Sequence, residues 1–208
     1  MTKDGKNPFD KAYKLSSAED TQKLYSDWSD TYDSQLGDTG YITPRRCAEA
    51  LALYSPDTSA PMLDIGCGTG LSGTALAAMG FTAIDGTDPS PEMIAVAQPK
   101  QLYQKLWLTD LSNPFDFKAG IYAAMAAVGV INPGHAPGST IRHVMDMLPI
   151  GGLFVFSLND NALKDSEIAT ALEDVCALSW VSVLHDEYGD HLPGIKLNAR
   201  IYVLQRTA

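Results

Sequence analysis

Short apolar segments alternate with helical segments along most of the chain, and this alternation predicts the fold class. Residues 121–130 form a continuous apolar run, typical of a central parallel strand that is covered on both faces. Strands are expected at residues 61–65, 81–88, 102–109, 121–130, 153–158, 180–184 and 199–205. Helices are expected at residues 71–79, 91–97, 139–148 and 165–178. This order predicts a doubly wound α/β domain whose last two strands form an antiparallel hairpin, with an extended loop at residues 185–196.

The chain before the first strand is expected to form a helical cap. Residues 1–17 are polar with little periodicity, so we expect a flexible arm there. A helix is expected within residues 18–35, where large side chains recur at helical intervals: Leu24, Tyr25, Trp28, Tyr32 and Gln35. A second helix is expected over residues 45–53, with Thr43 as its cap and Pro44 at its first position. We therefore expect one domain, with the arm at 1–17, the cap at 18–53 and the core at 60–208.

Composition and charge restrict the class of protein. The chain has 208 residues, of which 45% are hydrophobic, which is enough for one sizeable core. Its net charge of −10 disfavours a nucleic-acid backbone as partner. The three cysteines, Cys47, Cys67 and Cys176, are far apart and include no C-x-x-C pair, so neither a disulfide framework nor a metal site is expected. No apolar run approaches the length of a membrane span, and a cytoplasmic location is expected.

The most informative stretch is the glycine-rich segment LDIGCGTG, residues 63–70. Its glycines, Gly66, Gly68 and Gly70, separate an apolar strand from a helix, which is a turn where the backbone can approach a ligand at a helix N-terminus. A dinucleotide site requires a glycine at the sixth place, where this chain has Leu71. The alternative interpretation is a tight turn without a ligand.

A carboxylate is expected to accept the ribose hydroxyls about 20 residues after the first glycine. Asp88 and Asp85 are both near that place. We favour Asp88, because Pro89, Ser90 and Pro91 directly after it signal the start of a helix. Asp85 is expected to face solvent.

These motifs together resemble class I S-adenosylmethionine-dependent methyltransferases. The segments YSDWSDTYD and GYITPRRCAEAL, together with the Gly-x-x-Pro after the fourth strand, are most similar to the Williams-Beuren syndrome region methyltransferase group. The resemblance implies a Rossmann-like, seven-stranded, mostly parallel sheet with an antiparallel last strand, helices on both faces and an N-terminal helical lid. It also implies S-adenosylmethionine as the cofactor.

The resemblance further implies which residues contact that cofactor. Tyr32 would belong to the lid, and Asp110 with Leu111 would form the adenine site. Alternatively, Asp110 caps a turn with Ser112. The full set of expected cofactor residues is Tyr32, Asp64, Gly66, Cys67, Gly68, Gly70, Asp88, Pro89, Met93, Asp110, Leu111 and Ala126. Many family members have an aspartate where this chain has Ala123, so no role of that carboxylate is carried over.

The acceptor is expected to be a small molecule rather than nucleic acid, since the chain is short and acidic. His135 is the candidate base or acceptor anchor, because its Gly- and Pro-rich loop follows a central strand. His185 and His191 are secondary candidates, and His143 is expected on a helix surface. Two other functions remain open: an S-adenosylmethionine-binding protein without transferase activity, and a nicotinamide-dependent oxidoreductase. The glycine spacing and the absence of a Tyr-x-x-x-Lys relay disfavour the oxidoreductase.

Overall fold

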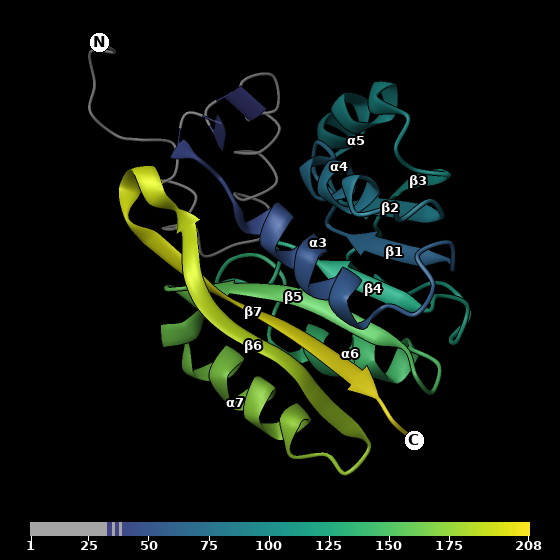
Figure 1. Cartoon of the computed structure of the whole chain (residues 1–208), viewed down its shortest axis with the longest axis vertical. Coiled ribbons are helices and arrows are strands. Elements are labelled where there is room, and N and C mark those ends of the chain that lie inside the picture. Colours follow the sequence, from purple (N-terminus) through teal and green to yellow (C-terminus); the bar gives the residue numbers. More distant parts are fainter. Residues whose placement is uncertain (1–32, 35, 38) are drawn as a thin grey trace.

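The computed structural model describes residues 33, 34, 36, 37 and 39–208, and a central sheet carries helices on both faces (Figure 1). Within these residues the strands are β1 (Met62–Ile65), β2 (Ile84–Asp88), β3 (Lys105–Leu108), β4 (Ala124–Ala127), β5 (Leu153–Asn159), β6 (Val181–Leu192) and β7 (Leu197–Arg206). The helices are α3 (Thr43–Tyr54), α4 (Leu71–Ala78), α5 (Pro91–Ala97), α6 (Ser139–Met147) and α7 (Ser166–Cys176), with single turns η1 (Gln98–Lys100), η2 (Ala162–Lys164) and η3 (Pro193–Ile195). None of the described helices combines the length and hydropathy that a membrane span requires.

The strand order is β3-β2-β1-β4-β5-β7-β6, and it confirms the expected mostly parallel sheet. Strands β1 to β5 pair in parallel, whereas β7 lies between β5 and β6 and is antiparallel to both. The chain order changes direction on either side of β1, which pairs with β2 on one side and β4 on the other. In open α/β sheets, such a switch point is where ligands bind, at the carboxyl ends of the strands.

Alternating side chains of the central strands build two separate cores. Met62, Val155 and Val203 pack with α3 and α4 on one face. Leu63 and Phe156 point to the other face and pack with α6 and α7. Because both faces of the sheet are covered, β4 is apolar throughout, which explains why the sequence around it, residues 121–130, is continuously apolar rather than alternating.

The connection from β3 to β4 departs from the usual pattern, because residues 109–123 contain neither helix nor strand. A parallel crossover is ordinarily made by a helix. Here Phe115, Phe117 and Tyr122 cover the sheet in place of one, and the Tyr122 hydroxyl donates to Asp85 Oδ2 at 2.9 Å. The expectation that Asp85 faces solvent is therefore wrong: it is 8% exposed and bonded beneath this crossover.

The expected loop at residues 185–196 is also wrong. Strand β6 continues to Leu192 and β7 begins at Leu197, so that only the single turn η3 and Lys196 connect them. The segment looked like a loop because it is polar, but polar groups stabilise it as strand: Arg200 Nη1 lies 2.7 Å from Asp186 Oδ1 across the hairpin.

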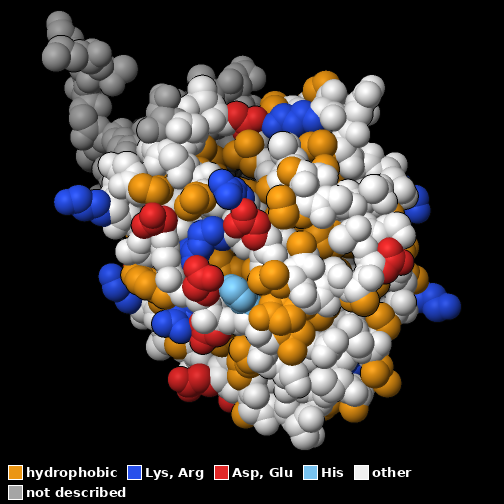
Figure 2. Space-filling model, in the orientation of Figure 1, with side chains coloured by type: hydrophobic (Ala, Val, Ile, Leu, Met, Phe, Trp, Pro, Cys, Tyr) orange, Lys and Arg blue, Asp and Glu red, His pale blue; other side chains and the backbone are white. Residues whose placement is uncertain are grey.

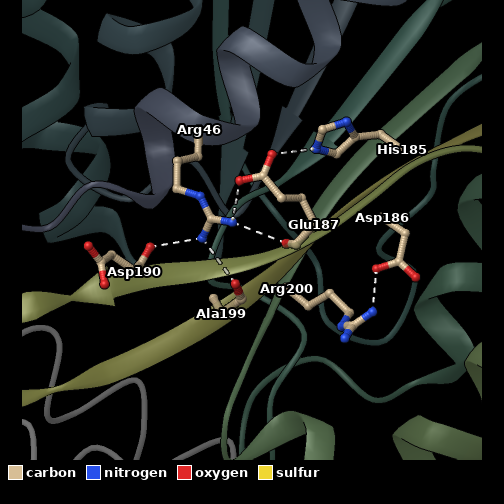
Figure 3. Close-up of polar contacts among 7 residues, drawn as sticks. All are labelled: Arg46, His185, Asp186, Glu187, Asp190, Ala199 and Arg200. Atoms are coloured by element: carbon tan, nitrogen blue, oxygen red, sulfur yellow. Dashed lines mark hydrogen bonds and ion pairs between the residues drawn. The ribbon is translucent and has the colours of Figure 1, made fainter.

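Helix α3 is fastened to this hairpin by Arg46 (Figure 3). The Arg46 guanidinium donates to the carbonyl oxygens of Asp190 at 2.8 Å, Ala199 at 3.0 Å and Glu187 at 3.1 Å. Thr43 acts similarly, since its hydroxyl bonds His191 Nδ1 at 2.7 Å. The expectation of Thr43 as a helix cap is thus wrong, because Thr43 is the first helical residue and its side chain is used by the hairpin.

Candidate active site

The glycine-rich turn joins β1 to α4, as the sequence predicts. Gly66, Gly68 and Gly70 all have positive φ angles, of 64°, 54° and 93°. A Cβ on Gly66 would lie 2.5 Å from Val130 Cγ2, whereas a Cβ on Gly68 would meet no atom within 4 Å. Gly66 therefore allows the turn to pack against the segment that follows β4, while Gly68 faces open space.

Asp88, the last residue of β2, is bound to this turn. Its Oδ2 accepts the backbone N–H of Gly68 at 2.9 Å, and its Oδ1 accepts that of Ser90 at 2.9 Å. The side chain is nearly buried, and burial raises the pKa of the carboxyl above its ordinary value, against the two backbone hydrogen bonds that lower it. Ser90 then caps α5 by accepting the N–H of Met93. The carboxylate is thus held at the strand end with a fixed orientation.

A cavity of about 480 Å³ opens above the carboxyl ends of the parallel strands, in the size range of small-molecule and cofactor sites. Gly66, Gly68 and Asp88 line one part of it. The other lining residues come from the crossover 109–115, the segment 128–130 after β4 and residues 134–143, together with Tyr41, Ile65, Pro89, Ser90 and Met93. The cavity therefore lies at the predicted edge of the sheet, and most of its lining side chains are apolar.

The predicted cofactor residues divide by position. Those that line the cavity are Gly66, Gly68, Asp88, Pro89, Met93 and Leu111. Those that do not are Asp64, Cys67, Gly70, Asp110 and Ala126. Asp110 is exposed, and its Oδ1 accepts both the N–H and the hydroxyl of Ser112, as in the turn-capping alternative. Tyr32, Tyr25 and Trp28 lie outside the described residues. The cofactor contacts themselves remain predictions.

Asp64 lies beneath the turn, fully buried. Its Oδ2 accepts the hydroxyls of Ser72 at 2.6 Å and Tyr103 at 2.8 Å, while Oδ1 has no hydrogen-bond partner among the described residues. Burial raises the pKa of this carboxyl to about 6, although the two hydroxyls lower it. Asp64 therefore bonds the first turn of α4 through Ser72 and does not line the cavity.

Tyr103 was not predicted to have a role, and it lies before β3 rather than within the strand expected at residues 102–109. Its ring fills the space left by two glycines: a Cβ on Gly73 would lie 2.5 Å from Tyr103 Cζ, and one on Gly86 would lie 2.8 Å from Tyr103 Cδ1. One tyrosine thus joins α4, β2 and the buried Asp64. No local sequence signal reveals this contact, since the partners are separated by up to 39 residues.

The segment before α3 contacts the turn from above through Asp33. Asp33 Oδ1 accepts the hydroxyl of Thr69 at 2.5 Å, and Asp33 Oδ2 lies 2.7 Å from Lys100 Nζ. Thr69 is 1% exposed and stands between two of the glycines. The glycine-rich turn is consequently bonded to two carboxylates, to Asp88 through the Gly68 N–H and to Asp33 through the Thr69 hydroxyl.

Two histidines line the cavity. His135 Nδ1 lies 3.3 Å from the carbonyl oxygen of Pro133. Because a carbonyl oxygen only accepts, this contact is a hydrogen bond in the tautomer that has its proton on Nδ1. Burial lowers the pKa of His135 below its ordinary value of 6.5, although the Pro133 carbonyl raises it, and the ring is therefore neutral near pH 7. His143, expected on a helix surface, is indeed exposed, but its face of α6 also lines the cavity. His191 and His185 lie on β6 and do not line it.

Comparisons with known proteins agree with this geometry. A family model described as "Methyltransferase domain" matches residues 40–204. Human methyltransferase-like protein 27 is 36% identical over 146 residues, covering 68% of this chain and 59% of the human protein. The 18S rRNA (guanine(1575)-N(7))-methyltransferase of Saccharomyces cerevisiae is 34% identical over 91 residues, covering 44% of this chain and 33% of the yeast protein. The chain therefore spans between one third and about three fifths of these relatives.

Among solved structures, the TehB-like SAM-dependent methyltransferase from Corynebacterium glutamicum has the same fold. The TM-score is 0.61 at 18% identity, covering 89% of this chain and all of that one.

Proposed function

Because the chain belongs to the methyltransferase domain family, we propose that it transfers a methyl group from S-adenosylmethionine to a small-molecule acceptor in the cavity. The observation that carries this proposal is the hydrogen bond between the Asp88 carboxylate and the backbone N–H of Gly68 in the glycine-rich turn. A carboxylate at the end of the second strand, fixed against such a turn, is suited to accept ribose hydroxyls. The cofactor, S-adenosylmethionine, is the one expected from the sequence motifs.

The residues present fit this cofactor. Gly68 leaves open space where any side chain would intrude, and Asp88 presents a buried carboxylate to the same cavity. Met93 and Leu111 supply apolar contacts suited to a purine ring. When bound, S-adenosylmethionine supplies a methyl group on a positively charged sulfur, so the protein has to align the acceptor and exclude water.

His135 is the proposed base. In the tautomer that donates from Nδ1 to the Pro133 carbonyl, Nε2 is the basic nitrogen of the ring. When an acceptor hydroxyl is methylated, its proton would pass to His135 Nε2. His135 would then lose the proton to solvent.

A second candidate acceptor is RNA, because the yeast relative is named as an 18S rRNA methyltransferase. Among the described residues that line the cavity there is no lysine or arginine to contact phosphate. Figure 2 shows basic and acidic side chains interspersed, rather than a continuous basic surface, on the face that carries α3 and the hairpin. These observations favour the small molecule. Within the family, we assign the chain to the Williams-Beuren syndrome region group on its N-terminal motifs.

The test has two parts. Calorimetry with S-adenosylmethionine, S-adenosylhomocysteine and NAD should give binding of the first two only; binding of NAD alone would point to the oxidoreductase. Labelled methyl is then followed from S-adenosylmethionine into a source-cell extract that is separated by size. Label in small molecules supports the proposal, whereas label in RNA or protein alone refutes the small-molecule acceptor. Cofactor binding without any transfer would favour a binding protein.

A further inference from the structure

Tyr41 lines the cavity but has no role in the function proposed above. It lies just before α3 and is the one tyrosine among the described residues that line the cavity. Its hydroxyl lies over Gly129, two residues past the end of β4: a Cβ on that glycine would be 3.0 Å from the hydroxyl oxygen. The N–H of Gly129 in turn donates to the Ser157 hydroxyl of β5 at 2.8 Å. The Tyr41 hydroxyl therefore reaches the cavity where β4 ends.

The hairpin formed by β6 and β7 holds the segment that carries Tyr41. The N–H of Ile42 donates to the carbonyl oxygen of His191, near the end of β6, at 3.2 Å. In the first turns of α3, Arg46 bonds the same hairpin through three carbonyl oxygens (Figure 3). No residue of β6 or β7 lines the cavity. The hairpin therefore affects the cavity through the residues that it positions.

The ring of His191 contacts the ring of Tyr41 directly. The two rings meet edge to face, with centroids 5.2 Å apart and an interplanar angle of 84°. The Thr43 hydroxyl bonds His191 Nδ1 at 2.7 Å, which fixes the orientation of the imidazole. The His191 side chain is buried, and burial lowers its pKa to about 4, so the ring that packs on Tyr41 is neutral near pH 7.

The Tyr41 hydroxyl and the proposed cofactor residues lie on opposite sides of β1. Asp88 ends β2, and Met93 and Leu111 follow β2 and β3 along the chain. The end of β4, where the Tyr41 hydroxyl lies, is on the other side of β1, and the loop of His135 follows the same strand. A cofactor that extends from the glycine-rich turn toward Asp88 leaves the β4 side of the cavity for the acceptor.

We propose that the Tyr41 hydroxyl hydrogen-bonds a polar group of the methyl acceptor and so determines acceptor specificity, and that His191 is the residue that positions it. This inference rests on the proposed function, since it names a contact on the acceptor side of the same cavity. A phenol both donates and accepts, so it fits an uncharged oxygen or nitrogen. Val128 and Val130, on either side of Gly129, line the cavity with apolar groups, so an acceptor oxygen or nitrogen placed beside them depends on the phenol for a partner.

Tyr41→Phe tests the contact, because it removes only the hydroxyl. The probe is the small-molecule fraction of the source-cell extract that takes up the most label, and the rate of methyl transfer is measured against increasing amounts of it. The amount that gives the half-maximal rate should rise about three- to tenfold, as for the loss of one hydrogen bond, while the maximal rate stays within about twofold. Tyr54→Phe is the matched control and should change neither, because Tyr54 of α3 also meets a histidine, His185, edge to face but lies outside the cavity.

The outcomes separate this assignment from the proposed function. An unchanged half-maximal amount in Tyr41→Phe would mean that the hydroxyl does not contact the acceptor. A loss of S-adenosylhomocysteine affinity by calorimetry that equals the loss in transfer would assign Tyr41 to the cofactor. A wild type that labels only RNA or protein would refute the small-molecule acceptor, and the same titration with the labelled fraction would then test Tyr41. A wild type that does not bind S-adenosylhomocysteine would refute both.

His191→Ala and Thr43→Val test the positioning. Each leaves the Tyr41 hydroxyl in the chain but removes a contact that orients it, so each should raise the half-maximal amount. His191→Asn keeps a polar group for the Thr43 hydroxyl and should lie closer to the wild type. Combining His191→Ala or Thr43→Val with Tyr41→Phe should cause no further rise, because both act only through that hydroxyl. A further rise in the double variants would overturn the positioning role.

Discussion

Replacing Asp64 by asparagine should change how stability depends on pH. The carboxyl is fully buried, accepts two hydroxyls on one oxygen, and has no partner on the other among the described residues. Its pKa is raised from 3.8 to about 6, chiefly by burial. The folded protein therefore binds this proton more tightly than the unfolded chain does. The stabilising effect is complete below about pH 4 and is lost as pH rises through about 6.

The size of the effect follows from the shift. One pKa unit corresponds to about 1.4 kcal/mol, so a shift of about 2 units implies that about 3 kcal/mol of unfolding free energy is lost across this window. In the Asp64→Asn variant the side chain has no proton to release. The unfolding free energy of the variant should consequently fall less than that of the wild type between about pH 4 and about pH 7.

Urea unfolding followed by circular dichroism at several pH values measures this difference directly. Tyr103→Phe is the informative companion, because it removes one of the two hydroxyls that stabilise the ionised form. The unfolding free energy of this variant should fall more than that of the wild type between about pH 4 and about pH 7, because the pKa of Asp64 rises further. Parallel curves for wild type and Asp64→Asn over the whole window would refute the reasoning and mean that Asp64 is already ionised at low pH in the folded protein.

Three further predictions concern the site. Asp88→Ala removes a carboxylate that should bind the ribose, and we expect about ten- to a hundredfold weaker binding of S-adenosylhomocysteine by calorimetry, with unchanged affinity pointing to another ligand residue. A double-mutant cycle on Asp33→Ala and Lys100→Ala should give a coupling free energy of about 0.5 kcal/mol in urea unfolding, smaller at high salt because the pair is partly exposed; a coupling of zero would mean that the ion pair does not hold the segment. His135→Gln should slow methyl transfer about a hundredfold without altering cofactor affinity, and the wild-type rate should fall only below pH 6.5, because burial lowers the pKa of the imidazole and its protonation removes the base. Equal rates for the two proteins would exclude His135 as the base.

The sequence predicted the parts of the fold that are encoded locally. The apolar run before Gly66, the three glycines and the proline after Asp88 each fix backbone conformation within a few residues, and the structure has the strand, turn and helix starts at those places. The seven-stranded order with an antiparallel last strand followed from the resemblance, not from periodicity alone.

What the sequence did not predict depends on contacts between distant segments. Asp85 looked exposed because nothing nearby suggests that Tyr122 would cover it in a crossover without a helix. Strand β6 looked like a loop because its polar groups find partners in distant segments. Arg46 of α3 donates to the carbonyl oxygens of Glu187 and Asp190, and Tyr188 donates to Asp160. His143 looked like an ordinary surface residue, since a helical pattern does not distinguish a face in solvent from a face that lines a cavity.

The ring of Tyr103 has a consequence for how this site can change during evolution. Gly73 and Gly86 do not have positive φ angles, so their backbone would accept alanine. Alanine is excluded by the volume of Tyr103 at Gly73, and by that of Tyr103 together with Leu106 at Gly86. Residues 73, 86 and 103 should therefore vary together among related chains. In related chains, a smaller residue in place of the tyrosine should coincide with alanine or serine at one or both glycine positions, and a tyrosine should coincide with glycine at both. A chain without the tyrosine would also lose the phenol that hydrogen-bonds the buried Asp64 carboxylate. The pKa of that carboxyl would therefore vary together with the packing of α4 against β2.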